Sequence, residues 1–494
     1  LHEQAARGRL SWRGPRARPL PDSDRPTRPQ HPRPIRSVKP DRALVSLVHL
    51  GCARNLIDSE LILGRMAEEG LTITGDPEHT HTVVLNTCSF IGPAREESEN
   101  AIRGLLERKK KGEIERVVVA GCLVQRYKQG LAEQFPEVDL FAEISDYKKL
   151  AQSVRALSDG RGVPQYLAAP GERAPEREGA RLLSTPKSYA YLRISHGCDH
   201  TCSFCAIPSI RGKHRSKSLE SVVGEARELV SSGVRELVLV AEDSTAWGRD
   251  GGKELPDLVE ALAQVDGVVR VRIMYAYPNR FPWRLLDVMK AYPQVAPYLD
   301  IPVQHIATNV LRAMRRAGSG DQVRGILDRL KNELPDITLR TTLLVGFPGE
   351  TDADAAELAE FVRTYGIGRI GAFTYSPEEG THGFDLPGRV PADVAQARYL
   401  AVLAARDEVL RASQRARIGQ EIEVLVDETQ PAGKIVIGRP AGDAPEVDLI
   451  AVVRNSRAAV GDRIMARVDA VDHEFNLACS AAVSARPRAA GRRA

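Results

Sequence analysis

The sequence is poor in cysteine and has no long apolar run. Seven cysteines in 494 residues are too few and too unevenly placed for a disulfide framework. No run approaches the roughly 18 consecutive apolar residues of a membrane helix, and the first residues do not have the pattern of a secretory signal. These absences exclude the disulfide-rich secreted and membrane-spanning classes, so we expect a cytoplasmic protein with no membrane association.

Length and charge limit the organisation of the chain. A chain of 494 residues exceeds what one hydrophobic core usually supports, so several domains are expected. Residues 1–42 hold eleven basic against four acidic residues and eight prolines, which predicts a disordered basic arm; residues 485–494 form a basic tail. The remaining body has 54 basic and 61 acidic residues. This balance favours a basic protein partner over a polyanion, and an ordinary solvated surface is the alternative.

Three similar units open the body of the chain. LVSLVHLGC (44–52), HTVVLNTC (81–88) and RVVVAGC (116–122) are each a β-branched apolar run that ends in a cysteine. Helical patterns separate them, so we predict a parallel α/β domain over residues 43–150. The carboxyl ends of parallel strands line the same crevice. The units therefore bring three cysteines together: Cys52, Cys88 and Cys122.

These three cysteines have two interpretations. Free cysteine is usually a small buried hydrophobe. That interpretation does not explain why each one follows a strand beside Gly51, Thr87 or Gly121, where the backbone can approach a ligand closely. We therefore predict a shared metal site.

The rest of the chain predicts a linker and two further domains. Residues 151–187 are rich in loop-forming residues. Residues 188–416 contain six strand and helix units, which predict an incomplete barrel that is open on one side. Residues 417–484 change to short alternating strands with glycine turns, which predict a small antiparallel β-barrel. The predicted fold class is thus a multidomain α/β protein.

A second group of cysteines directly follows the first strand of the predicted barrel. HGCDHTCSFCAIPSIRG (196–212) holds Cys198, Cys202 and Cys205 in the spacing C-x3-C-x2-C. Three thiolates on a four-iron cube leave one iron open to substrate. A zinc site is the alternative and would need a fourth ligand. The nearby candidates are His196, His200 and His214.

The motif resembles the radical S-adenosylmethionine (radical SAM) enzymes, in which an aromatic residue precedes the third cysteine, here Phe204. The resemblance extends over about residues 43–484 to the methylthiotransferases, whose last domain is called TRAM. Within that family, the motifs are closest to the enzyme that modifies an aspartate of ribosomal protein S-twelve. The motifs are GCARNLIDSE, NTCSFIGPAREES, GCLVQRY, HGCDHTCSFCAIPSIRGKHRS, PVQH, RTTLLVGFPGET and FTYSPEEGT.

The resemblance implies two [4Fe-4S] clusters. Cys198, Cys202 and Cys205 would hold the radical-generating cluster, and Cys52, Cys88 and Cys122 an auxiliary cluster that takes the sulfur co-substrate. One SAM would methylate that sulfur, and a second would yield the radical that removes hydrogen from the β-carbon of the aspartate. The seventh cysteine, Cys479, has no cysteine partner and is expected to be a buried structural residue.

Further residues are predicted at the mouth of the barrel. Glu242, Asp243, Gln304 and Arg340 lie at or near the ends of predicted strands, where SAM should bind, and Arg340 would pair with its carboxylate. The alternative for all four is a set of hydrogen bonds without a ligand role. Phe204 borders the adenine of SAM or only packs the loop.

The sequence departs from the family pattern at two places. The family tends to have Pro-Lys where this chain has Ala53-Arg54, which keeps a cation. It tends to have Gln-Asp where this chain has Glu242-Asp243, which adds a negative charge near the barrel mouth.

Two other functions compete with the aspartate methylthiotransferase. One is the tRNA methylthiotransferase, which acts on an anticodon-loop adenosine. Residues 418–484 have eleven acidic against six basic residues and one aromatic, Phe475, whereas RNA binding requires a positive groove and stacking platforms. The other is a non-catalytic metal-cluster protein that binds nucleic acid. The expected partners are S-twelve or the assembled small subunit, a flavodoxin- or ferredoxin-type electron donor and a sulfur donor.

Overall fold

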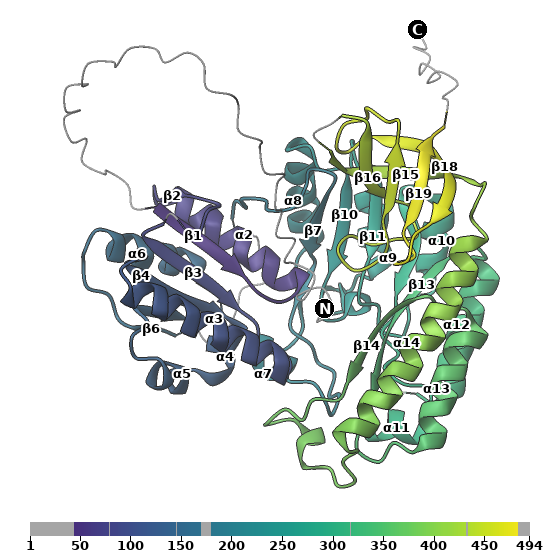
Figure 1. Ribbon diagram of the computed structural model, residues 1–494, viewed down its shortest axis with the longest axis horizontal. Coiled ribbons are helices and arrows are strands. Elements are labelled where there is room, and N and C mark those ends of the chain that lie inside the picture. The colour runs from purple at the N-terminus through teal and green to yellow at the C-terminus, as the bar shows by residue number, and fades with distance from the viewer. Residues whose placement is uncertain are drawn as a thin grey trace, which may run out of the picture.

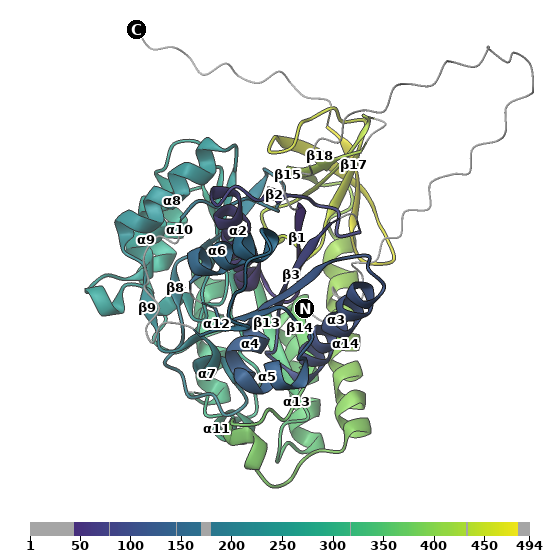
Figure 2. The ribbon, with the colours of Figure 1, turned by 90° about the vertical axis from the view of Figure 1, so that its left-hand side faces the viewer.

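The computed structural model describes residues 44–482 except 79, 145, 169–178, 317 and 431–432. The predicted basic arm and basic tail lie outside these residues. The described chain forms an amino-terminal α/β domain, a partial barrel and a carboxyl-terminal small barrel (Figure 1). Turned by 90°, the amino-terminal domain lies in front of the partial barrel, and the small barrel lies above both (Figure 2).

The amino-terminal sheet has six parallel strands in the order β2-β1-β3-β4-β5-β6. The three predicted strands are β1 (Leu44–His49), β3 (Thr82–Thr87) and β4 (Arg116–Gly121). Every residue of β3 is buried, as expected for a β-branched run covered on both faces. The other elements are α2 (Ala53–Glu68), β2 (Thr72–Ile73), α3 (Gly92–Lys110), α4 (Cys122–Tyr127), α5 (Gln129–Gln134), β5 (Leu140–Ala142), α6 (Tyr147–Ser158) and β6 (Tyr166–Leu167).

The predicted boundary between residues 150 and 151 is wrong. Helix α6 runs across it, with Leu150, Ala151 and Val154 buried on one face. Strand β6 lies inside the predicted linker, and its Tyr166 pairs with Phe141 of β5. The sheet therefore continues into the segment 151–187. The sequence does not reveal this strand, because two residues are too few to show a strand period.

The partial barrel is a sheet of six parallel strands in the order β14-β13-β12-β11-β10-β7. The edge strands β7 and β14 do not pair with each other within the described chain, so the barrel is open on one side, as predicted. The strands are β7 (Tyr189–Arg193), β10 (Glu236–Val240), β11 (Arg270–Ile273), β12 (Val295–Asp300), β13 (Thr338–Val345) and β14 (Arg369–Thr374). The remaining elements are β8 (Ser195–His196), α7 (Ile207–Arg211), β9 (Arg215–Ser216), α8 (Leu219–Ser231), η1 (Ser244–Ala246), η2 (Arg249–Gly251), α9 (Leu255–Ala263), α10 (Arg284–Ala291), α11 (Thr308–Ala313), α12 (Gly320–Glu333), α13 (Asp352–Tyr365), η3 (His382–Asp385) and α14 (Ala392–Arg415).

Alternate residues of the barrel strands belong to two different cores. Leu237 and Leu239 of β10 pack in the core that contains residues of the surrounding helices. Val238 and Val240 of the same strand face the other way and share a core with Ile57 of α2 and the amino-terminal sheet. The amino-terminal domain therefore covers the inner face of the partial barrel, where α2 lies beside β7 (Figure 1).

The carboxyl-terminal domain is a closed barrel of five strands. The sequence predicts four of them and misses β19, which contains Cys479; this residue is 1% exposed, as expected for a structural cysteine. The barrel is not purely antiparallel, because β17 and β19 run parallel. A closed ring with an odd number of strands needs at least one parallel pair. The strands are β15 (Glu421–Thr429), β16 (Ile435–Arg439), β17 (Ala451–Arg454), β18 (Arg463–Val471) and β19 (Leu477–Ala481).

The loop between β16 and β17 joins the small barrel to the partial barrel. Its Asp448 accepts a hydrogen bond from Tyr298 Oη at 2.7 Å. Its Asp443 pairs with Arg369 at 2.6 Å. Its Ala444 is buried in the core of the inner face. No helix of the described residues is long and apolar enough to cross a bilayer.

Candidate active site

The first group of cysteines, here called the strand-end site, consists of Cys52, Cys88 and Cys122. Cys88 and Cys122 directly follow Thr87 and Gly121, which are register partners on β3 and β4. Cys52 is the N-cap of α2, three residues after the end of β1. Three neighbouring parallel strands thus deliver one thiol each to the same edge of the sheet, as predicted from the repeated units.

Two glycines make this convergence possible. Gly121 has φ +103°, and a Cβ on it would lie 2.4 Å from Asn86 Oδ1 and 2.6 Å from the backbone of Thr87. Gly51 has φ +106°, and a Cβ on it would lie 2.9 Å from Cys88 Cβ. Both glycines therefore let the backbone lie close to the end of β3 and to Cys88, and their predicted role in the approach of a ligand stays a prediction.

The second group, here called the loop site, consists of Cys198, Cys202 and Cys205. The loop is closed at its base, where β8 pairs with β9 and Cys198 N donates to Gly212 O at 3.1 Å. Its middle is fixed by Ser203, whose backbone N and Oγ donate to the end of α11 at 2.9 and 2.8 Å. The three thiols are half-buried at the carboxyl end of the first barrel strand.

A buried ion network connects the two sites. Arg211, at the end of the cysteine loop, donates from Nη2 to Cys122 Sγ at 3.2 Å. Its Nη1 pairs with Asp58 of α2 at 2.7 Å, and Asp58 also pairs with Arg193 of β7 at 2.6 Å. Tyr147 donates to the same carboxylate at 2.5 Å. Each charge in this network is buried and paired, which is the condition under which buried charges are tolerated.

The thiol pKa values follow from burial and from these cations. Burial raises the pKa of Cys198 and of Cys205 to about 12, and Arg54 and Arg316 oppose the shift at Cys205. Burial also raises the pKa of Cys122. At Cys52 burial is outweighed by Arg54 and Arg211, so its pKa falls below the usual range. Arg54, Arg211 and Arg316 thus lie where their charges favour the thiolates of Cys52, Cys122 and Cys205.

Arg54 and Arg316 connect the thiols to the barrel mouth. Arg54 donates from Nη1 to Ala241 O at 3.0 Å, just beyond β10, and lies over the ring of Tyr275 at 4.8 Å. Arg316 approaches Cys202 Sγ at 3.7 Å and stacks on Tyr277 at 4.1 Å. Neither arginine was predicted as a site residue. The motif GCARNLIDSE contains Arg54 and Asp58. These two charged residues within a helical pattern, close to Cys52, were the sequence features that could have indicated a role at the site.

Asp243 supports the cysteine loop. Its carboxylate accepts from His200 Nε2 at 2.7 Å and from Thr245 N at 2.9 Å, and these hydrogen bonds oppose burial and lower its pKa. His200 in turn stacks on Tyr277, with ring centroids 3.8 Å apart. Glu242 lies beside Asp243, and its buried Oε2 has no hydrogen-bond partner among the described residues. A ligand role for Glu242 or Asp243 stays a prediction.

The other three predicted SAM residues lie in different surroundings. Phe204 packs against the apolar cluster that contains Met314 and Phe347. Gln304 has φ +71° and forms an isolated bridge with Leu343.

Arg340 is the third residue of β13 and not at its end. It pairs with Asp300 at 3.0 Å and lies 3.5 Å from Asp448 of the small barrel. These two carboxylates already occupy its guanidinium, so its predicted pairing with SAM has no support from the contacts.

The residues present fit iron–sulfur clusters by their donor chemistry. Each site offers three thiols with no fourth cysteine. No three His, Cys, Asp or Glu side chains of the described chain surround a common point as ligands of one metal ion. In a four-iron cube each thiolate binds a different iron atom. The three thiols therefore do not have to meet at one point, as ligands of a single metal ion would.

Comparisons with known proteins match three segments of the chain, which correspond to the amino-terminal domain, the partial barrel and the small barrel. Residues 44–143 match the family described as "Uncharacterized protein family UPF0004", residues 192–362 the "Radical SAM superfamily", and residues 418–479 the "TRAM domain". The protein from Myxococcus xanthus called ribosomal protein uS12 methylthiotransferase RimO is 39% identical over 87% of this chain and 90% of its own length. Its namesake from Sorangium cellulosum is 42% identical over 82% and 84%. The chain belongs to the RimO family.

RimO membership makes the chain a radical SAM methylthiotransferase, and the radical SAM class implies a [4Fe-4S] cluster and SAM. Among solved structures, the radical S-adenosylmethionine methyltransferase TsrM from Kitasatospora setae matches with a TM-score of 0.49. The two are 16% identical, and the match covers 68% of this chain and 77% of that chain.

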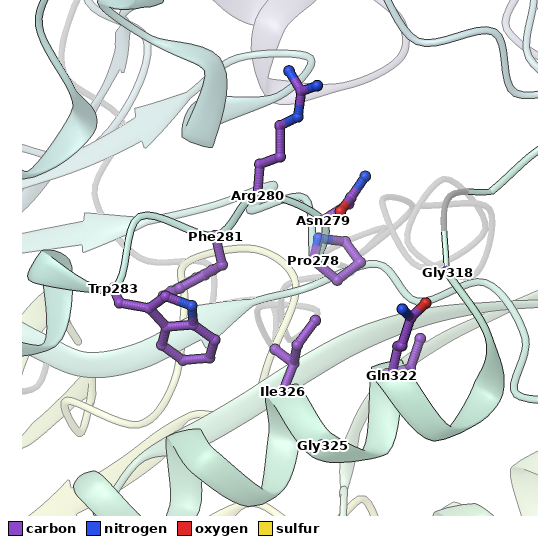
Figure 3. Close-up of a pocket in the computed structure, with 10 residues that line it drawn as sticks. Pro278, Asn279, Arg280, Phe281, Trp283, Gly318, Gln322, Gly325 and Ile326 are labelled. Atoms are coloured by element: carbon purple, nitrogen blue, oxygen red, sulfur yellow. The ribbon is translucent and has the colours of Figure 1, made fainter.

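A pocket of about 520 Å³ lies apart from both cysteine sites of this RimO-family chain. Figure 3 shows Phe281 and Trp283 on one side of it and Ile326 and Gln322 of α12 on the other. None of the predicted site residues lines this pocket.

Proposed function

We propose that the protein transfers a methylthio group to the β-carbon of an aspartate in ribosomal protein uS12. The observation that supports this most is the contact between Arg211 of the cysteine loop and Cys122 of the strand-end site. Hydrogen removal and sulfur transfer must act on the same carbon atom. The loop site and the strand-end site must therefore lie close enough for one substrate side chain to reach both. The names of the RimO relatives supply the substrate.

We assign the two sites to two [4Fe-4S] clusters. Cys198, Cys202 and Cys205 would hold the cluster that binds SAM, and Cys52, Cys88 and Cys122 the auxiliary cluster. When bound, these groups would supply the electron, the hydrogen-abstracting group and the iron that takes up sulfur. The protein's own residues hold the two sites in register through Asp58, fix the cysteine loop through Ser203, and exclude water with the core shared by α2 and the barrel.

The small barrel supports a protein substrate over the tRNA alternative. Residues 418–484 carry eleven acidic and six basic residues with Phe475 as their only aromatic. A ribosomal protein is strongly basic and complements such a surface, whereas RNA does not. We further propose that the enzyme works in the cytoplasm with a flavodoxin- or ferredoxin-type electron donor and a separate sulfur donor.

The test is an anaerobic reaction with reconstituted protein, SAM, a reductant and sulfide. uS12 and anticodon-loop tRNA are offered separately, and each product is measured by mass spectrometry. We expect a methylthio adduct on uS12 and none on a uS12 variant whose target aspartate is Asn. An adduct on tRNA alone would replace the substrate by the alternative. SAM cleavage without any adduct would leave the radical chemistry and remove the substrate assignment.

A further inference from the structure

Arg54 reaches from one cysteine site toward the other. It lies two residues after Cys52, yet its guanidinium donates to Ala241 O beyond β10 and covers the ring of Tyr275 beyond β11. Both contacts belong to the carboxyl mouth of the partial barrel, on which the loop site is built. Arg54 thus reaches from the amino-terminal domain to the mouth of the partial barrel.

Arg54 has no carboxylate within ion-pair distance among the residues that the structure describes. The buried arginines nearby are different, because Arg193 and Arg211 pair with Asp58, and Arg340 pairs with Asp300. Arg54 uses Nη1 on a backbone carbonyl, and among the described residues it also interacts with the thiol of Cys52 and with the charge of Glu242. A guanidinium that no carboxylate of the described chain holds suits a carboxylate of the substrate, which it can bind with two parallel hydrogen bonds.

The position of Arg54 in its helix is also unfavourable unless an anion is present. It is the second residue of α2, a helix of 16 residues with no acidic residue in its first turn. The amino-terminal end of a helix carries partial positive charge, so a cation there is destabilising and an anion is stabilised. The helix end and Arg54 together form a positive site that opens toward the barrel mouth.

We propose that Arg54 binds the side-chain carboxylate of the target aspartate and selects a carboxylate substrate over a neutral one. This inference rests on the proposed function and adds to it the residue that recognises the substrate. Arg54 acts on the thiol of Cys52 in the strand-end site and on that of Cys205 in the loop site, so a side chain that it held by the carboxylate would lie near both sites. The simpler alternative is that Arg54 only stabilises the thiolate of Cys52, its neighbour along the chain.

The test compares binding of two uS12 peptides to the reconstituted holoenzyme under anaerobic conditions. One peptide carries the target aspartate and the other has Asn in its place, and the dissociation constants are measured by fluorescence anisotropy. We expect the wild-type protein to bind the Asp peptide about tenfold more tightly, because a charge-assisted hydrogen bond is lost with Asn. R54Q should weaken the Asp peptide to the level of the Asn peptide and leave the Asn peptide unchanged. R54K keeps the charge but loses the planar fork, so it should retain part of the preference.

R65Q is the matched control. Arg65 lies in the last turn of the same helix, about 16 Å along its axis from Arg54, and pairs with Glu68. R65Q removes the same charge from α2 and should keep the full preference for Asp. Iron content and 5′-deoxyadenosine formation are measured on every variant.

Three results would overturn the proposal. R54Q could weaken both peptides equally, could weaken neither, or could lose iron from the strand-end site, in which case Arg54 serves the cluster. Modification of uS12 by the wild-type protein is measured in parallel. If the wild-type protein does not modify uS12, the proposed function itself fails; if it does and R54Q still shows one of these results, only the role of Arg54 fails.

Discussion

The loop site holds its three thiols within eight residues of one loop, whereas the strand-end site collects its thiols from three separate strands. The loop carries much of its own structure, because β8 pairs with β9 at its base. The strand-end site exists only when β1, β3 and β4 are in register. It also receives Arg211 from the other site's loop. One site is therefore mainly local, and the other depends on tertiary structure and on the contact between domains.

The largest effect is expected when the thiols of one site are removed and those of the other are kept. C198A/C202A/C205A should abolish 5′-deoxyadenosine formation, and C52A/C88A/C122A should keep it while losing methylthio transfer. Each triple variant should retain about half of the iron, because one four-iron cube remains. Iron analysis and product chromatography measure both quantities. If either variant lost all of its iron, the two sites would not be separate clusters.

Arg211 should tune the strand-end site alone. In the C198A/C202A/C205A background, R211M removes an N–H···S hydrogen bond to Cys122 and a nearby positive charge. The hydrogen bond and the positive charge both stabilise the reduced cluster, which is the more negative form. Their loss should lower the reduction potential by about 60 mV, which is a tenfold change in the equilibrium constant of a one-electron reduction. Redox titration followed by electron paramagnetic resonance measures it.

R193M is the control for this titration, because Arg193 pairs with the same Asp58. Each variant removes one partner of a buried carboxylate, which costs about 3–5 kcal/mol of stability. R211M should shift the potential more than R193M, because only Arg211 also donates a hydrogen bond to the sulfur of Cys122. Equal shifts in the two variants would mean that the buried charge matters and the hydrogen bond to sulfur does not.

Gly121 tests how far the strand-end site depends on its sheet. A side chain at φ +103° that meets Asn86 and the backbone of Thr87 should cost about 2 kcal/mol or more. G121V should therefore lower the free energy of unfolding of the amino-terminal domain in urea and release iron from this site first. At Gly130 a Cβ meets nothing within 4 Å, so G130A should be close to neutral. A stable G121V protein with full iron would contradict the dependence on register.

The smallest effect is expected at Glu378, which joins the helices after Cys88 and Cys122 to the last barrel strand. It pairs with Arg126 of α4 at 2.8 Å and accepts from Gly92 N at the start of α3 at 2.6 Å. E378Q should speed hydrogen exchange at the start of α3 by an amount that corresponds to about 1–2 kcal/mol. The exposed neighbour gives the control E379Q, which should have no effect. Unchanged exchange in E378Q would mean that the apolar core alone holds the two domains together.

The sequence predicts the two cysteine sites from local signatures, and their role stays a prediction. Cys198, Cys202 and Cys205 form a short motif within one loop. The other three cysteines each follow a predicted strand and are spaced at nearly equal intervals along the chain. The three-domain order and the open partial barrel follow from the alternation of strands and helices. The clusters themselves and the SAM contacts stay predictions, whereas the boundary predicted after residue 150 is wrong because α6 runs across it.

The remaining features depend on contacts between residues distant in the chain. Arg211 and Cys122 are 89 residues apart, and no period in the sequence connects them. Arg340 has two aspartate partners, and one of them, Asp448, lies in another domain. Strand β6 has two residues and was hidden in the predicted linker. Such pairings are decided by the packing of domains, which composition and periodicity do not describe.

The loop between β16 and β17 also has a consequence for the order in which the protein folds during synthesis. Asp443 and Asp448 complete the ion pairs of Arg369 and Arg340, which the ribosome delivers much earlier. Until the last part of the chain emerges, the nascent partial barrel contains buried arginines that lack these partners. The partial barrel thus reaches its final form only after the loop between β16 and β17 has been made, and a chain that ends before this loop should be degraded more readily by the cell's proteases.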